Sequence, residues 1–133
     1  MDLTQLTERI GGRERRTVDL DIGRYLEPPF EAGEAVLTLR EPTTTAFYAA
    51  AETAEAWRRK SHPEFTRQQA FTVQLLARCH TSPVFTTDAE LLGFYAKAAS
   101  ENPPLFLHLV TTLHGEFPWL MSLGAEAENR LGE

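Results

Sequence analysis

Hydrophobic residues along this chain follow one period near the N-terminus and another after residue 42. In residues 17–22 and 34–40, apolar and polar side chains alternate, which is typical of strands with one buried face. The side chains expected on the buried faces are Val18, Leu20, Ile22, Ala35, Leu37 and Leu39. These segments predict a two-stranded antiparallel element. Two strands alone are marginally stable, so we expect the helix that follows them to pack across their apolar face.

The connection between the two predicted strands, residues 23–33, is too long for a tight hairpin turn. Pro28 and Pro29 keep it extended, and it still displays three large apolar side chains, Tyr25, Leu26 and Phe30. A loop of this composition usually folds back on its own sheet. A contact loop for a partner is the alternative.

The segments after Pro42 predict helices, each preceded by a residue that can cap its N-terminus. The expected helices cover residues 43–60, 66–79, 88–99 and 103–114, and a last helix begins at Pro118. The expected caps are Thr43 or Thr44, then Thr66 and Thr87 with capping boxes to Gln69 and Glu90, and Asn102. Gly115 is expected just past the fourth of these helices. A short leader helix over residues 3–10, capped by Asp2 and stopped by a left-handed residue at Gly11 or Gly12, precedes the strands.

The order of elements predicts an α+β fold that is mainly helical. An N-terminal two-stranded antiparallel β element is followed by four to five packed helices, with no fixed repeat. The chain is expected to form a single domain. Its parts are the leader (residues 1–12), the β element (17–40), the helical part (43–124) and a polar tail (125–133).

Residues 103–124 contain a single acidic or basic residue, Glu116, although such residues make up 24% of the chain. Apolar side chains leave little polar face on this helix, so it must be covered on nearly all sides. One interpretation is a surface for a partner, and the other is the central helix of a closed core. The candidate partner-binding residues are Phe106, Leu109, Val110, Leu113, Phe117, Trp119 and Leu120. Among them we expect Phe106, Val110 and Leu113 in the core, and Phe117 and Trp119 at the contact.

Charge and cysteine content narrow the class of protein. The net charge is −6, and acidic residues exceed basic ones in both halves, 12 to 9 over residues 1–64 and 7 to 4 over residues 65–133. No basic surface for nucleic acid is therefore expected. The single cysteine, Cys79, excludes an internal disulfide and suits a reducing compartment. No secretion signal or membrane-spanning run is visible, which predicts a soluble cytoplasmic protein.

Candidate catalytic and metal-binding residues do not form a recognised pattern. His108 and His114 are six residues apart and project to different sides of a helix, and adjacent Cys79 and His80 point about 100° apart. The motif from Asp19 to Asp21 resembles the start of a calcium loop. The later positions, Arg24 and Phe30, lack the required glycine and glutamate. The sequence predicts no catalytic residue, no metal site and no cofactor, so an enzyme is the least favoured class.

The later helices resemble the tail assembly chaperones of long-tailed phages and prophages. The resemblance rests on the segments 75–79 (LLARC), 82–85 (SPVF) and 88–92 (DAELL), followed by a proline-led apolar helix up to Gly115. It implies a non-enzymatic protein that coats the tape measure protein in the host cytoplasm and helps the tail-tube protein polymerise. It also implies a longer frameshifted product joined near residue 125. A small structural or adaptor subunit that self-associates through the apolar helix is the alternative.

Overall fold

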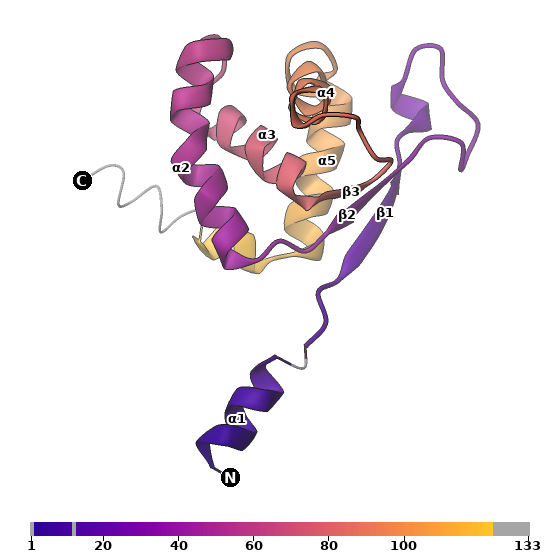
Figure 1. The fold of residues 1–133 in the computed structure, drawn as a ribbon. Helices are drawn as coiled ribbons and strands as arrows, with labels where there is room; N and C mark the ends of the chain where they lie inside the picture. The colour runs from indigo at the N-terminus through magenta and orange to yellow at the C-terminus, as the bar shows by residue number, and fades with distance from the viewer. Residues whose placement is uncertain (1, 12, 124–133) are drawn as a thin grey trace.

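The computed structural model describes residues 2–11 and 13–123 of the chain. It is mainly helical with one three-stranded antiparallel sheet (Figure 1). The elements in chain order are α1 Leu3–Ile10, β1 Thr17–Asp21, the 3-10 helix η1 Gly23–Tyr25, β2 Val36–Arg40, α2 Thr44–Ser61, α3 Arg67–Cys79, β3 His80–Ser82, α4 Asp88–Glu101 and α5 Pro103–Glu116. Residues 119–123 are also helical, and the predicted polar tail lies outside the described residues.

The predicted caps are confirmed at the N-terminus of every α-helix from α1 to α5. Each capping side chain accepts a backbone N–H of the first turn, and the five capping residues are Asp2, Thr43, Thr66, Thr87 and Asn102. The box at Thr66 is complete, since the Gln69 side chain accepts the Thr66 N–H at 2.8 Å. At α4 the box is incomplete, because the Glu90 carboxylate accepts the N–H of Thr86 rather than that of Thr87.

Two predicted helix ends differ from the structure. α5 continues through Gly115 to Glu116, and the N–H of Phe117 donates to the carbonyl of Leu113. The helix stops here because Pro118 restricts the backbone of the residue before it, whereas a glycine is merely a weak helix former. Gly11 ends α1 with φ of −75°, in the right-handed rather than the left-handed region.

The sheet contains a strand that the sequence did not predict. β1 and β2 pair antiparallel as expected, with Leu20 opposite Leu37. β3 adds to the other edge of β2, giving the order β1-β2-β3. Its three residues, His-Thr-Ser, are too few and too polar for a period of two to be detected. The predicted N-terminal pair of strands is therefore present, and the third strand, which comes from a later part of the chain, was not predicted.

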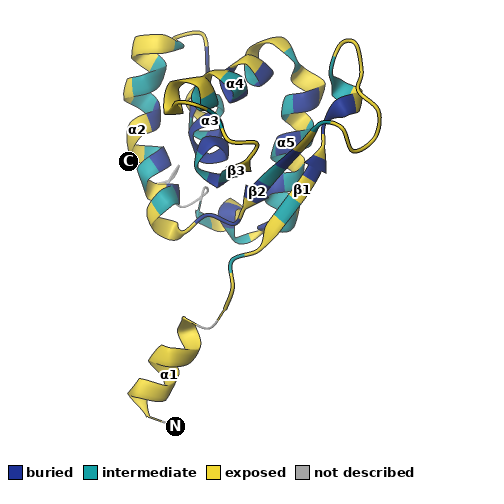
Figure 2. Cartoon of the chain, turned by 45° about the vertical axis from the view of Figure 1, so that its right-hand side comes forward, coloured by how far each residue is buried: buried dark blue, intermediate teal, exposed yellow. Residues whose placement is uncertain are grey.

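The predicted cover of the sheet was also wrong. α3, not α2, packs against β2, and α3 lies between α2 and the sheet in both views (Figures 1 and 2). α5 lies beside β1, and Asn102 at the start of α5 donates to the carbonyl of Tyr25 in η1 at 2.8 Å. α2 leaves the end of β2 after a three-residue connection and packs on α3.

The centre of the core is α3. Its buried residues come from all sides of the helix and are Ala70, Thr72, Val73, Gln74, Leu75, Leu76, Ala77 and Cys79. The side-chain oxygen of the buried Gln74 has a partner within the protein, because it accepts from Arg78 Nη1 at 2.6 Å. The alternative that α5 is the central helix is thus not what the fold adopts.

Candidate interaction surfaces

Helix α1 lies apart from the helical body in both views and has no buried residue (Figure 2). Leu3, Leu6 and Ile10 lie on one side of it and are 78%, 48% and 78% exposed. This set is called here the α1 stripe. Its spacing of three and four residues matches the way an amphipathic helix contacts an apolar groove. The sequence predicted a detachable leader helix here but did not single out these three side chains as a contact surface.

The segment that follows α1 is fixed to the body through three arginines. Arg13 forms two hydrogen bonds with the Glu41 carboxylate, at 2.9 and 3.1 Å. Arg15 donates to the Glu41 carbonyl, and Arg16 pairs with Glu116 at the end of α5 at 2.8 Å. The chain is therefore held from residue 13 onward, so the part that extends from the body is α1.

Glu41 is the acidic centre of this attachment. The residue is 2% exposed, and its carboxylate also accepts the indole N–H of Trp119 at 2.7 Å. Hydrogen bonding from Arg13, helped by Trp119 and the Arg16 N–H, lowers the pKa of Glu41 to about 2 despite the opposing effect of burial. Glu41 thus joins the segment before β1 to the segment after α5.

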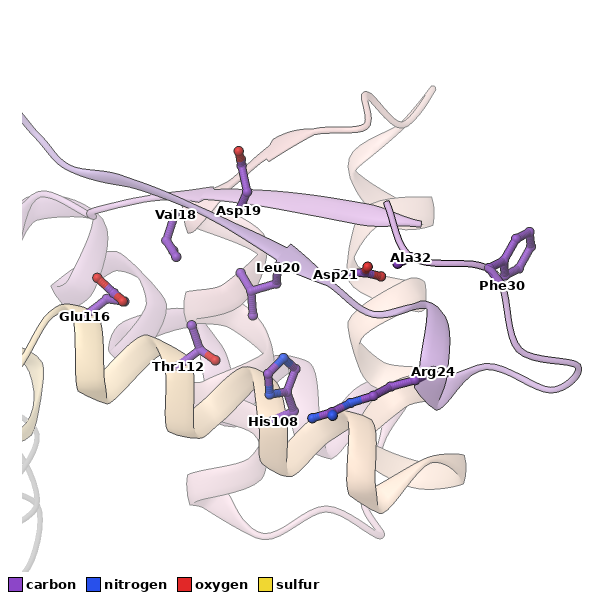
Figure 3. A pocket seen from close by; sticks show the side chains of 10 residues that line it. All are labelled: Val18, Asp19, Leu20, Asp21, Arg24, Phe30, Ala32, His108, Thr112 and Glu116. Carbon is purple, nitrogen blue, oxygen red and sulfur yellow. The ribbon is translucent and has the colours of Figure 1, made fainter. Parts of the chain in front are cut away.

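A groove with a volume of about 530 Å³ separates β1 from α5 (Figure 3). This β1–α5 groove is lined by Val18, Asp19, Leu20, Asp21, Arg24, Phe30, Ala32, His108, Thr112 and Glu116. Val18 and Leu20 point from β1 toward α5, whereas Asp19 points away from it. The sequence singled out none of the α5 residues of this groove as interacting, because their role depends on a strand that lies about 90 positions earlier in the chain.

Most of the predicted partner-binding residues lie in the core. Leu109, Leu113, Phe117 and Leu120 are at most 1% exposed and offer no side-chain surface. Those that keep partial exposure are Phe106, Val110 and Trp119. The expected division is therefore wrong for Phe117, which is core, and Trp119 is already engaged by Glu41. The most exposed apolar residue of α5 is Leu107, at 66%, which was not among the candidates.

The predicted contact loop folds back in one part and is exposed in the other. The Tyr25 ring stacks on His108 with centroids 4.9 Å apart, and Leu26 packs against the core. Phe30 is 53% exposed at the end of the groove. The folded-back alternative is thus confirmed for Tyr25 and Leu26, and a contact at Phe30 stays a prediction.

The surroundings of Cys79, His80 and His114 give each of these residues a structural explanation. Burial raises the pKa of the Cys79 thiol to about 12, so the reactive thiolate is not formed at neutral pH. His80 contacts the Tyr95 hydroxyl through Nδ1 at 2.7 Å and the Pro83 carbonyl through Nε2. Burial lowers the pKa of His114.

Within residues 2–11 and 13–123, no three His, Cys, Asp or Glu side chains are grouped so that they could hold a metal ion. In the same part of the chain, no helix combines the length and apolar character needed to cross a membrane. Comparisons with protein-family models, curated proteins and solved structures found no match for this chain. The resemblance to tail assembly chaperones therefore stays a prediction.

Proposed function

We propose that this chain is a non-enzymatic assembly protein that binds a partner protein through α1. The α1 stripe carries the proposal, since Leu3, Leu6 and Ile10 form an apolar surface that no other described residue covers. A second protein that buries the stripe gains about 25 cal/mol for each Å² of apolar surface removed from water.

The length of α1 supports the same role. A helix of eight residues without tertiary contacts is marginal in water, because helix nucleation is costly. The capping box at Asp2 and Gln5 favours its first turn. Burial of the stripe by a partner supplies the remaining stabilisation. α1 is accordingly a segment whose folding is coupled to binding.

The partner proposed is a tape measure protein of a phage tail, with the tail-tube protein as a second contact, in the host cytoplasm. The choice rests on the resemblance of segments 75–79, 82–85 and 88–92 and of the apolar helix to tail assembly chaperones. A long helical chain with apolar stripes presents the kind of surface that an amphipathic helix can cover. Coating it before the tube assembles keeps that surface from aggregating.

The test is co-expression of the chain with the tape measure protein encoded beside it, followed by pull-down and a solubility assay. The variant Leu6→Glu places a charge in the stripe, and we expect it to lose the partner while keeping the fold. Gln5→Glu is the matched control, since it adds the same charge on another side of α1 and preserves the capping box. Failure of the unchanged chain to retain the tape measure protein, or retention by Leu6→Glu, would refute the proposal.

A self-associating structural subunit is the second candidate, and one observation favours it. Leu107 is 66% exposed on α5, beside the half-buried Phe106 and Val110. An oligomer interface would cover this outer side of α5. Light scattering of the purified chain distinguishes the two candidates. A stable closed oligomer that Leu107→Glu dissociates supports the subunit, and a monomer excludes it.

A further inference from the structure

Strand β1 is an edge of the sheet, and its outward peptide groups are unpaired. The N–H of Ile22 donates to the carbonyl of Ala35, and the N–H of Glu41 donates to the carbonyl of Arg16. Antiparallel strands alternate, so the even-numbered residues from 16 to 22 bond to β2. Thr17, Asp19 and Asp21 then direct their N–H and C=O groups away from the sheet, and no described residue pairs with those groups.

The unpaired edge borders the β1–α5 groove along its length (Figure 3). β1 and α5 run antiparallel, because Arg16 pairs with Glu116 at one end and Tyr25 stacks on His108 at the other. From His108 to Glu116 the helix rises about 12 Å at 1.5 Å per residue. The five residues of β1 span about 13 Å. The groove therefore has the length of a strand of four or five residues.

The spacing of side chains along α5 also matches a strand. His108, Thr112 and Glu116 line the groove at intervals of four residues, which is about 6 Å on a helix. Side chains on one face of a strand repeat every 6.6 Å or so. A strand added beside β1 would place every second side chain against this row of α5, while its backbone bonds the edge.

The carboxylates along the edge of β1 determine which kind of strand can pair with it. Asp19 and Asp21 are held in place, Asp19 by the Thr38 hydroxyl at 2.6 Å and Asp21 by the N–H groups of Gly23 and Gly33. Arg24, which lines the groove, stacks on the Tyr25 ring, and Arg16 beside the edge is paired with Glu116. A second copy of β1 in symmetric pairing would set Asp19 against Asp19, and like charges directly opposite are destabilising. Basic side chains opposite these carboxylates are favourable.

We propose that the β1–α5 groove binds an extended segment of another protein, four or five residues long with lysine or arginine at alternate positions, which adds to the sheet beside β1. The apolar side chains between its basic residues face Val18, Leu20 and the α5 row. This site is separate from the α1 stripe and does not rest on the function proposed above. A Leu6→Glu variant leaves it unchanged.

The test uses the peptide acetyl-Lys-Val-Lys-Val-Lys-amide as probe and the same peptide with Glu for Lys as control. Amide hydrogen exchange by NMR is measured on the full chain. In the free protein we expect fast exchange at Thr17, Asp19 and Asp21 and slow exchange at Val18 and Leu20. The lysine peptide should slow exchange at the three odd-numbered amides. No protection there, or equal protection by the glutamate peptide, would overturn the proposal.

Two variants separate the backbone contribution from the charge. Thr17→Pro removes an outward N–H and keeps both carboxylates, and it leaves the β1–β2 ladder intact because proline is tolerated where a strand's N–H faces away from its neighbour. It should weaken peptide protection at Asp19 and Asp21. Asp19→Lys keeps the N–H. It should lower the affinity for the lysine peptide roughly fivefold or more and raise the affinity for the glutamate peptide. Glu52→Lys, the same charge change on exposed α2, should leave both affinities unchanged. If Asp19→Lys behaves like Glu52→Lys, the proposed charge recognition is wrong.

Discussion

Helices α3 and α5 are 13 and 14 residues long, but their side chains are covered to very different extents. Eight residues of α3 are buried, including Thr72 and Gln74, whereas α5 buries Leu105, Leu109 and Leu113. α3 packs against α2, α4 and β2. α5 packs against α4 and borders a groove on the side of β1. The number of elements packed around a helix decides its burial more than its own hydropathy does.

The two helices also differ in how their polar groups are satisfied. In α3, the Gln74 side-chain oxygen accepts from Arg78 and, at 3.4 Å, from the Thr53 hydroxyl, which offsets the cost of burying this oxygen. In α5, the buried Nδ1 of His114 has no partner among the described residues. The end of α5 is fixed by polar contacts instead, since Arg16 binds Glu116 and Glu41 binds Trp119 just beyond.

The largest expected difference is between leucine truncations in the two helices. Leu76→Ala in α3 removes a fully buried side chain and should lower the free energy of unfolding by about 2–5 kcal/mol. Leu107→Ala in α5 is the control, since this leucine is 66% exposed, and its effect should stay within about 0.5 kcal/mol. Urea unfolding followed by circular dichroism measures both. Equal losses would show that the two helices are equally covered in solution.

The second-largest expected effect is the loss of the hydrogen bonds that Glu41 makes near the end of α5. Glu41→Gln keeps the shape but weakens the bonds to Arg13 and Trp119, and should cost about 1–3 kcal/mol at pH 7. The folded pKa of Glu41, about 2, lies below its ordinary value of 4.5. The contribution of ionised Glu41 to the free energy of unfolding is therefore full above pH 4.5, and it is lost as the pH falls toward 2.

This pH dependence is checked by measuring the free energy of unfolding between pH 7 and pH 3, for the unchanged chain and for Glu41→Gln. The two curves should approach each other as the pH falls. Trp119 fluorescence should also report loosening of the segment after α5 in the variant. Parallel curves over the whole range would mean that the Glu41 carboxylate titrates as it does in the unfolded chain.

Local signals were enough to predict the helix starts, because a cap and its helix are neighbours in the sequence. The five capping side chains were all identified this way, and so was the pairing of the first two strands. The central place of α3 was not predicted, since Thr72 and Gln74 in the sequence resemble exposed positions. Their burial depends on neighbours that only the tertiary fold supplies.

The candidate interaction surfaces were harder to predict for the same reason. Glu41 contacts Arg13, 28 positions earlier, and Trp119, 78 positions later. No local pattern distinguishes it from a solvated glutamate before a proline. The β1–α5 groove likewise depends on two segments about 90 residues apart. The α1 stripe is exposed because no described element packs against it, and periodicity alone does not reveal that.

The smallest expected effect tests the unsatisfied group in α5. Burial lowers the pKa of His114 below its ordinary value of 6.5. The neutral His114 ring is therefore favoured in the folded chain. The contribution of this neutral ring to the free energy of unfolding is full above pH 6.5, and it is lost as the pH falls through the pKa of His114 in the folded chain. His114→Leu removes both the titration and the unpaired Nδ1, and should raise the free energy of unfolding by about 1 kcal/mol. Urea titrations of both proteins from pH 7.5 to 5 should show a flatter profile for the variant, in a range where Glu41 contributes constantly. A lower stability for His114→Leu at pH 7.5 would mean that the imidazole is satisfied in solution, and that α5 resembles α3 more closely than its burial indicates.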